Sequence, residues 1–277
     1  MATTELTERT IASFPGLFAR ASGKRRATVV FLHGAFGDHT VFRNYLGHFS
    51  AAGFDGVAVA RRGRLGVGPQ NAKGVTIEDY LDDTRAVLDV IGGNPILIGH
   101  SLGGLLAQVL AAEGRCAAAV LVAPAPPGML TAQPSALPTF LPNMPKIMLG
   151  LPFTVPAGGC RKIALNRIDD ESERARIHGT LNPESGLVYR SMMFGSIKVD
   201  ASKVKCPIFV VGGEDDRIVS AALNKSTAKH YGAELLLLPQ HAHWLPEEPG
   251  WEVACDAMIG WLSARTPRDD VRAPAVC

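Results

Sequence analysis

A serine stands at the centre of the short sequence Gly99-His100-Ser101-Leu102-Gly103, between an apolar run and a run of strong helix formers. A tight turn from a strand into a helix needs small residues two positions before and two positions after its apex, because a side chain there would collide with neighbouring backbone. Gly99 and Gly103 meet that need. Ser101 is therefore predicted to stand out from the turn as a nucleophile, beside helix N–H groups that favour developing negative charge.

Candidate partners for such a serine follow two later apolar runs. Two adjacent aspartates, Asp215 and Asp216, come after the first of these runs, and two histidines, His241 and His243, come after the second. A histidine can take the proton of a serine hydroxyl, and a carboxylate can hold that histidine in the required tautomer. Because adjacent residues cannot both point at one imidazole, one of the aspartates is expected to be a loop carboxylate.

The elements that must position these residues alternate along the chain. Short runs that are apolar at consecutive positions predict strands covered on both faces. Amphipathic segments between them predict helices, one opened by a capping box at Thr76–Asp79 and a last one over 251–262. Alternation of this kind gives an α/β fold, a mostly parallel sheet with helices on both faces. The predicted strands are 28–32, 56–60, 95–98, 118–122, 207–211 and 234–238.

The alternation is interrupted once. Nine of the 19 prolines lie between Pro124 and Pro156, and no further strand is predicted before Pro207. Proline at this density fragments helices, but the segment is rich in Leu, Met and Phe, so we expect it to fold over the sheet as an apolar cap. The expected organisation is a core of residues 1–125 and 204–264, a cap or lid over 126–203, and a flexible tail over 265–277.

Taken in order, these motifs resemble the α/β-hydrolase fold family, and the likeness extends over residues 27–262. A further motif of the family, Phe31–Phe36 with its His-Gly pair, lies at the end of an early predicted strand. In the family, a backbone N–H just after this pair helps to form an oxyanion hole. The resemblance assigns that N–H to Ala35, with Phe36 as the second choice, and the other N–H to Leu102, the residue after the nucleophile.

The resemblance also selects the acid. In the family it lies three residues past a glycine and just before an X-Ile/Val-Val stretch, which favours Asp216 over Asp215. Some relatives place the acid after the strand that follows the elbow helix. Residues 123–126 occupy that place here and hold no carboxylate.

The histidine is selected in the same way. In the family it precedes an apolar residue and an acidic, proline-containing segment, which favours His243, although Ala242 stands where glycine is usual. His241 is expected to be a loop histidine, and His33 to shape the loop that contains it. The chain order of nucleophile, acid and histidine is then the order of the hydrolase fold.

The resemblance implies a serine hydrolase that cleaves carboxylic esters of small to medium apolar substrates through an acyl-enzyme intermediate. This chemistry needs no metal, nucleotide or flavin, so no cofactor is expected. Serine at the elbow disfavours the epoxide hydrolases and haloalkane dehalogenases of this fold, which use aspartate there. Lactonase, thioesterase, perhydrolase, hydroxynitrile lyase and C–C hydrolase activities stay open, as does a ligand-binding protein on the same scaffold. The implied triad is Ser101, Asp216 and His243.

The composition of the expected cap bears on the substrate. Five of the seven methionines fall between residues 128 and 194. Methionine suits irregular apolar surfaces, so an apolar pocket that prefers neutral esters is expected, although packing of the cap against the sheet would explain the methionines equally well. Lys146, Arg161 and Lys162 would alter that preference if they faced inward.

Net charge and cysteine content argue against other classes of protein. A net charge of +2, from 28 Lys and Arg against 26 Asp and Glu, argues against a nucleic-acid binder. The basic runs at 24–26 and 61–62 are expected to be solvated, and 61–68 to be an ordinary surface loop. Five scattered cysteines show no metal or disulfide spacing, and neither a secretory signal nor a membrane span is visible. A soluble cytoplasmic enzyme acting on a small molecule is expected, with its oligomeric state left open.

Overall fold

The computed structural model describes residues 5–64, 69–130 and 133–266. The strands in these residues are β1 (Leu6–Ile11), β2 (Phe14–Ala19), β3 (Ala27–Leu32), β4 (Phe54–Val59), β5 (Ile96–His100), β6 (Ala118–Val122), β7 (Ile208–Gly213) and β8 (Glu234–Leu238). The α-helices are α1 (Arg43–Ala51), α2 (Ile77–Ile91), α3 (Leu102–Ala112), α4 (Leu137–Phe140), α5 (Met144–Met148), α6 (Ala157–Ile163), α7 (Glu171–Gly179), α8 (Gly186–Met193), α9 (Ala221–Tyr231) and α10 (Trp251–Ser263). Short 3-10 helices are η1 (His39–Phe42), η2 (Pro69–Ala72), η3 (Leu141–Asn143) and η4 (Ala201–Lys203).

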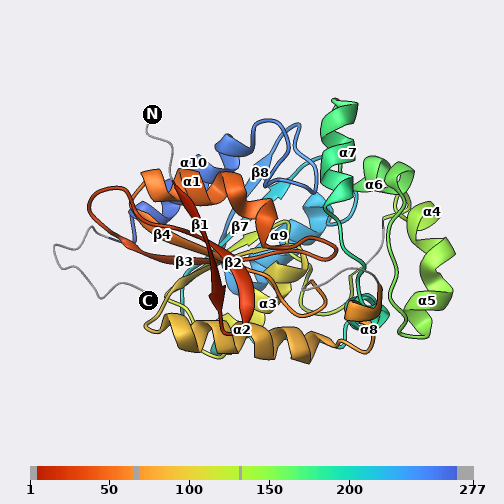
Figure 1. Cartoon of the computed structure of the whole chain (residues 1–277), viewed down its shortest axis with the longest axis horizontal. Coiled ribbons are helices and arrows are strands. Elements are labelled where there is room, and N and C mark those ends of the chain that lie inside the picture. The colour runs from red at the N-terminus through yellow and green to blue at the C-terminus, as the bar shows by residue number, and fades with distance from the viewer. Residues whose placement is uncertain (1–4, 65–68, 131–132, 267–277) are drawn as a thin grey trace.

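The strands of the described residues form one sheet of eight strands in the order β1-β2-β4-β3-β5-β6-β7-β8. Strands β3 to β8 run parallel, and β1 and β2 add an antiparallel edge. Helices α1 and α10 cover one face, while α2, α3 and α9 cover the other (Figure 1). The predicted α/β class is therefore confirmed. Because the six strands β3 to β8 are parallel, their carboxyl ends lie at the same end of the sheet, where loops from distant parts of the chain converge.

The capping box at the start of α2 is also confirmed. The Thr76 hydroxyl accepts the N–H of Asp79 at 3.2 Å, and the Asp79 carboxylate accepts the Thr76 N–H at 2.8 Å. By contrast, the sequence analysis predicted no strand before residue 28. The hairpin of β1 and β2 was missed because β1 is an edge strand with only one fully buried residue, Ile11, and lacks the continuous apolar run of the inner strands.

Residues 126–203, which we call the helical insertion, connect β6 to β7. They hold α4 to α8 and gather beside the sheet in Figure 1. The first helices are short, and prolines occupy first-turn positions in α4, η3 and α5. Proline is tolerated there and opposes continuation of a preceding helix, which explains the fragmentation expected from the sequence.

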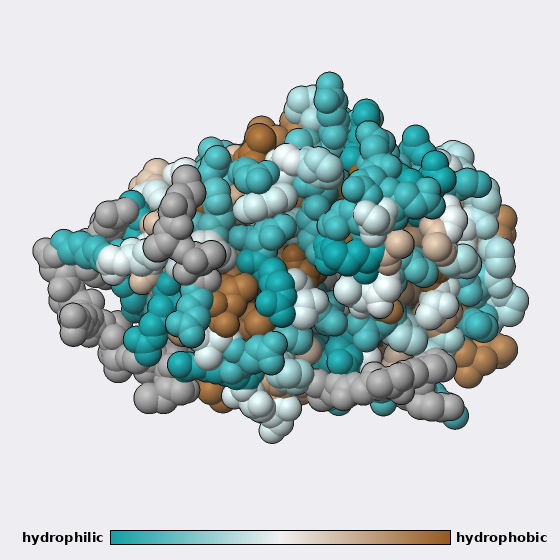
Figure 2. Space-filling model, turned by 45° about the horizontal axis from the view of Figure 1, so that its top comes forward, coloured by the Kyte–Doolittle hydropathy of each residue, from teal (hydrophilic) through white to brown (hydrophobic). Residues whose placement is uncertain are grey.

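The outer side of the helical insertion exposes apolar side chains. Leu141 is 60% exposed and Leu149 is 73% exposed. Figure 2 shows apolar surface at the right-hand end of the molecule, the end that holds α4 and α5 in Figure 1. In the described part of the chain, no helix is both long and apolar enough to cross a membrane.

Most of the predicted tail lies outside the described residues. Its first two residues make specific contacts: Arg265 donates to the carboxylate of Glu234 at 2.6 Å, and the carbonyl of Thr266 accepts from Arg26 at 2.9 Å. These two residues are therefore held against the core.

The prediction that Arg61 and its following residues form a solvated surface loop is wrong for two arginines. Arg61 is only 3% exposed and Arg64 only 7%. Burial is tolerated because the guanidinium of Arg61 lies over the ring of Tyr80, 4.8 Å from its centroid, and donates to the carbonyl of His33 at 2.9 Å. Arg62 is the one that reaches partly into solvent, and it pairs with Asp83 at 2.5 Å.

Candidate active site

Ser101 lies at the apex of the turn between β5 and α3. Its φ of 54° is in the left-handed region, which a residue with a side chain rarely adopts. Two backbone hydrogen bonds hold this conformation: the Ser101 N–H donates to the carbonyl of Val122, and the Ser101 carbonyl accepts the N–H of Ala125, both at 2.9 Å. The strained turn lifts the side chain out of the sheet.

The two glycines around the serine are required by close backbone contacts. A Cβ on Gly99 would lie 2.3 Å from the carbonyl oxygen of Gly103, and a Cβ on Gly103 would lie 2.0 Å from that of Leu32. Both distances are far below van der Waals contact, and backbone atoms cannot move aside as a flexible side chain would. The steric argument made from the sequence is confirmed.

A chain of hydrogen bonds links the serine to the predicted histidine and acid. The Ser101 hydroxyl lies 3.0 Å from Nε2 of His243, and Nδ1 of His243 lies 2.7 Å from Oδ2 of Asp216. The other carboxylate oxygen of Asp216 accepts the N–H groups of Ile218 and Val219 at 2.7 and 2.8 Å. Asp216 and His243 are both buried, so this relay is shielded from water.

The neighbouring acid and histidine point elsewhere. Asp215 forms a partly exposed ion pair with Arg167 at 2.5 Å. His241 is held between the carbonyl oxygens of Pro239 and Gly250, at 2.9 and 3.2 Å. Of the two candidates at each place, the structure brings only Asp216 and His243 to Ser101.

His100 is a residue of this site that the sequence analysis did not single out. Its Nε2 donates to the carbonyl oxygen of His243 at 2.8 Å. Burial, with a smaller contribution from the nearby His243, lowers the pKa of His100 to about 3, so the ring is neutral at physiological pH. Its only signal in the sequence is its position before the nucleophile, where many residue types are compatible with the turn.

Glu248 holds the backbone of the loop that carries His243. Both of its carboxylate oxygens accept the N–H of Ala242, at 3.0 and 3.1 Å, and the side chain is buried. Burial raises the pKa of Glu248 from 4.5 to about 7, against the opposing hydrogen bond from Ala242. The carboxyl group therefore stabilises the position of His243 through the backbone.

The pKa of Glu248 predicts a pH-dependent stability. Between about pH 4.5 and 7 the folded protein holds a proton on Glu248 that the unfolded chain releases, so the contribution of this group to the free energy of unfolding falls as pH rises through that window. Glu248→Gln is neutral at every pH and can still accept the N–H of Ala242. We expect the melting temperature of the wild type minus that of the variant to decrease from pH 4.5 to 7.5 in matched thermal melts. A constant or increasing difference would contradict the assignment.

The two residues predicted to supply N–H groups to the oxyanion hole follow neighbouring strands of the sheet, Ala35 after β3 and Leu102 after β5. Leu102 is the first residue of α3, so its N–H has no partner within the helix. Ala35 lines the same cavity as Ser101. The N–H of Phe36, the second choice, donates to the carboxylate of Glu184 at 3.3 Å, which favours Ala35.

Comparison with known proteins identifies the family of this chain. The sequence model of the alpha/beta hydrolase family matches residues 29–254. The chain belongs to the alpha/beta hydrolase family. It is 28% identical over 263 residues to Epoxide hydrolase 3 of Xenopus tropicalis, a match that covers 84% of this chain and 71% of the other.

Solved structures share the fold of this hydrolase at low sequence identity. A monoacylglycerol lipase from Paleococcus ferrophilus superposes with a TM-score of 0.70 at 20% identity, covering 95% of this chain and 100% of the other. A soluble variant of monoglyceride lipase from Saccharomyces cerevisiae gives a TM-score of 0.71 at 16% identity, covering 96% and 97%. The family assignment predicted from the motifs is confirmed, and the chain is an enzyme of the hydrolase type.

Ser101 of the hydrolase opens into a cavity of about 590 Å³, a volume that includes space open to solvent. No lysine, arginine, aspartate or glutamate lines this cavity among the described residues. Lys146, Arg161 and Lys162 are all exposed on the helical insertion. The lining from the helical insertion is Leu130, Phe140, Val155, Cys160, Ile163, Ala164, Leu181, Tyr189 and Met192.

A second apolar cavity of about 490 Å³ adjoins the first within the helical insertion. The two share four lining residues, namely Leu130, Phe140, Tyr189 and Ile218. The methionines of the helical insertion divide between these spaces and the surface: Met192 lines the first cavity, Met144 and Met193 the second, and Met129 and Met148 are exposed. In the described residues, no group of three or more His, Cys, Asp or Glu side chains is arranged to hold a metal ion.

Proposed function

We propose that this hydrolase cleaves neutral carboxylic esters with small to medium apolar groups through an acyl-enzyme on Ser101. One observation carries the proposal above the others. The serine, histidine and aspartate form a continuous, shielded relay, at 3.0 and 2.7 Å, that ends in an apolar cavity.

In the first half of the reaction, Oγ of Ser101 attacks the acyl carbon while Nε2 of His243 takes the hydroxyl proton. The N–H groups of Ala35 and Leu102 stabilise the oxyanion that forms, each contributing about 3–4 kcal/mol to the transition state by analogy with measured cases. His243 then gives the proton to the departing alcohol. Asp216 accepts the Nδ1–H of His243, which keeps Nε2 facing the serine and stabilises the imidazolium.

In the second half, His243 takes a proton from a water molecule, and the resulting hydroxide attacks the ester carbon of the acyl-enzyme. The tetrahedral intermediate uses the same oxyanion hole. Its collapse breaks the bond between the acyl carbon and Oγ, His243 returns the proton to Ser101, and the carboxylic acid leaves.

The likeness to Epoxide hydrolase 3 does not favour the same reaction here. The epoxide hydrolases of this fold use aspartate at the elbow, and this chain has serine at residue 101. A serine hydroxyl attacks an acyl carbon with an oxyanion hole in place, which suits esters, thioesters and lactones. We therefore rank ester hydrolysis first, and a substrate panel should include an epoxide, a thioester and a lactone beside the esters.

The apolar lining predicts how activity depends on substrate size. We propose that the helical insertion acts as a cap, with the acyl or alcohol group of the substrate held between it and Ser101. Each methylene that enters the cavity should contribute about 0.8 kcal/mol to transition-state binding, a rise in kcat/KM of about fourfold per methylene. With p-nitrophenyl esters of increasing acyl length, kcat/KM should rise until the cavity is filled and then level off or fall. An ester bearing a carboxylate should react more slowly than a neutral ester of equal length.

Two substitutions, one inside the cavity and one on the surface, test whether the cavity sets this chain-length profile. Met192 lines the cavity, so Met192→Trp should fill part of it and move the optimum to shorter chains. Met148 is 45% exposed on α5, so Met148→Trp should leave the profile unchanged. A flat chain-length profile combined with a preference for anionic esters would exclude the apolar cap while leaving the relay untouched.

A further inference from the structure

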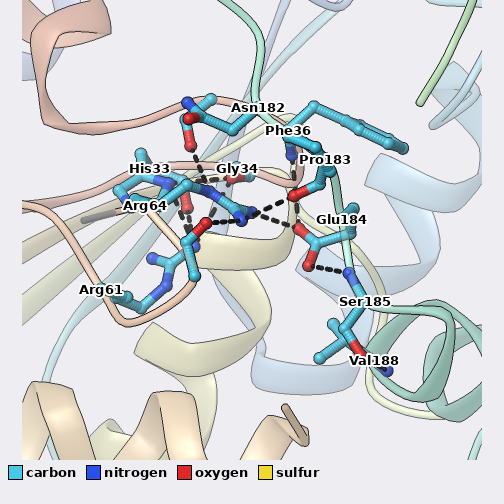
Figure 3. A network of polar contacts seen from close by, with 12 residues as sticks. His33, Gly34, Phe36, Arg61, Arg64, Asn182, Pro183, Glu184, Ser185 and Val188 are labelled. Carbon is cyan, nitrogen blue, oxygen red and sulfur yellow. Dashed lines mark hydrogen bonds and ion pairs between the residues drawn. The ribbon is translucent and has the colours of Figure 1, made fainter. Parts of the chain in front are cut away.

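A buried ion pair joins the helical insertion to the loop that follows β4, and that loop in turn contacts the one that carries Ala35. Glu184 and Arg64 lie 2.5 Å apart, and both side chains are fully buried. Figure 3 shows the Glu184 carboxylate directed at Arg64 and at the backbone of Phe36. Burying two charges costs desolvation energy that the pair seldom recovers as stability, so such a pair is weak evidence for a purely stabilising role.

Every position around the Glu184 carboxylate is occupied by a donor. Oε2 accepts from Arg64 and from the N–H of Phe36, at 2.5 and 3.3 Å. Oε1 accepts from the hydroxyl of Tyr80 and from the N–H of Ser185, both at 2.8 Å. Burial raises the pKa of Tyr80, so its phenol stays protonated and can donate. The carboxylate is thus fixed by three contacts and offers the fourth to Phe36.

Phe36 is the residue that needs this support. Its φ of 63° is in the left-handed region, which costs a residue with a side chain of order 1–3 kcal/mol. Both of its backbone polar groups bond to the helical insertion, because its carbonyl accepts the N–H of Asn182 at 2.7 Å while its N–H donates to Glu184. Arg64 ties down the next residue by donating to the carbonyl of Gly37 at 2.9 Å.

We propose that Glu184 is a positioning residue for the oxyanion hole: by holding the Phe36 N–H, it keeps the preceding N–H, that of Ala35, directed into the cavity beside Ser101. The inference rests on the proposed function, in which Ala35 stabilises the oxyanion. It adds that the helical insertion takes part in catalysis by setting the geometry of this loop, and not only by enclosing the substrate. A displacement of Glu184 away from Phe36 would release the strained backbone and misdirect the donor.

Two double variants test this proposal. They differ only in whether the side chain at position 184 can accept a hydrogen bond. Arg64→Met/Glu184→Leu and Arg64→Met/Glu184→Gln both replace the ion pair with neutral residues, a change that buried pairs often tolerate. Only glutamine can still accept the N–H of Phe36. With the best ester of the panel, we expect kcat of the Leu variant to be at least about tenfold below that of the Gln variant, with KM values within about threefold, since removal of one oxyanion donor costs about 10²–10³-fold in kcat.

A second measurement separates positioning from structure. A trifluoromethyl ketone forms a tetrahedral adduct with the serine whose oxyanion occupies the hole, so its inhibition constant should weaken in step with kcat, while KM does not. Asp83→Asn is the matched control, because Asp83 is a buried carboxylate whose hydrogen bonds are made with Arg62, a residue outside the 33–37 loop. It should lower the melting temperature and leave kcat within about threefold.

The outcomes are distinguishable. If the wild type hydrolyses esters through Ser101 but the two double variants have equal kcat, the positioning role of Glu184 is overturned and the proposed function stands. A wild type that hydrolyses no ester overturns the proposed function and this inference with it. If the Leu variant does not fold, Glu184→Asp decides, because it retracts the carboxylate by one methylene, a shift that the flexible side chain of Arg64 can follow and the backbone N–H of Phe36 cannot. A tenfold loss of kcat at unchanged KM supports the proposal, and an unchanged kcat overturns it.

Discussion

Ser101→Ala should lower kcat for ester hydrolysis by about 10⁶-fold, the size of loss seen when the nucleophile of a serine relay is removed. The methyl group cannot form an acyl-enzyme, and the residual rate then comes from the oxyanion hole and binding alone. KM and the melting temperature should change little, because alanine fits the turn and only the 3.0 Å hydrogen bond to His243 is lost. Steady-state kinetics with the best ester of the panel, together with thermal melts, measure both quantities.

Ser226→Ala provides the matched control. Ser226 is exposed on α9, far along the chain from the elbow, and the same substitution there should leave kcat unchanged. A Ser101→Ala variant that retains more than about one per cent of wild-type turnover would place the nucleophile elsewhere.

Asp216→Asn should lower kcat by about 10⁴-fold, as loss of tautomer control does in such relays. The structure gives the reason. The backbone N–H groups of Ile218 and Val219 require an acceptor, so the amide oxygen of asparagine will face them. Its NH₂ group then faces Nδ1 of His243, which forces the proton onto Nε2 and leaves no acceptor for the hydroxyl of Ser101.

The adjacent acid supplies the control for this substitution. Asp215→Asn loses one partly exposed ion pair with Arg167, which is worth about 1 kcal/mol or less. Its kcat should stay within about threefold of wild type in the same assay. Equal losses in the two variants, or the reverse ranking, would refute the assignment of Asp216.

The inner part of the fold could be predicted from the sequence because its strands are covered on both faces. β5 and β6 are buried at every position, and runs of consecutive apolar residues are the direct consequence of that burial. The hairpin at the edge lacks this signal. β1 is buried only at Ile11, and the buried part of β2 is only four residues long and begins with a glycine, so neither strand contains a long apolar run.

Part of the candidate site could likewise be predicted from the sequence, and part could not. Ser101, Asp216 and His243 follow strands whose carboxyl ends must meet, so the sequence could predict that the three loops converge, and the family resemblance selected Asp216 and His243 from the neighbouring candidates. The supporting residues His100 and Glu184 contact backbone more than 140 residues away, which no local spacing reports, and Glu248 contacts the N–H of Ala242 through a loop conformation that its sequence does not reveal. Arg61 and Arg64 were misjudged for the same reason: a basic residue is usually solvated, and only the fold supplies the ring and carbonyl groups that bury these two.

Covalent labelling tests the central claim most directly. A fluorophosphonate transfers its phosphonyl group to an activated serine with loss of fluoride, and the adduct is stable enough for intact-mass analysis and peptide mapping. The account predicts one adduct per chain, located on Ser101, that forms in the wild type and in Ser226→Ala and is absent from Ser101→Ala. An unlabelled wild type, or an adduct that persists in Ser101→Ala, would contradict it.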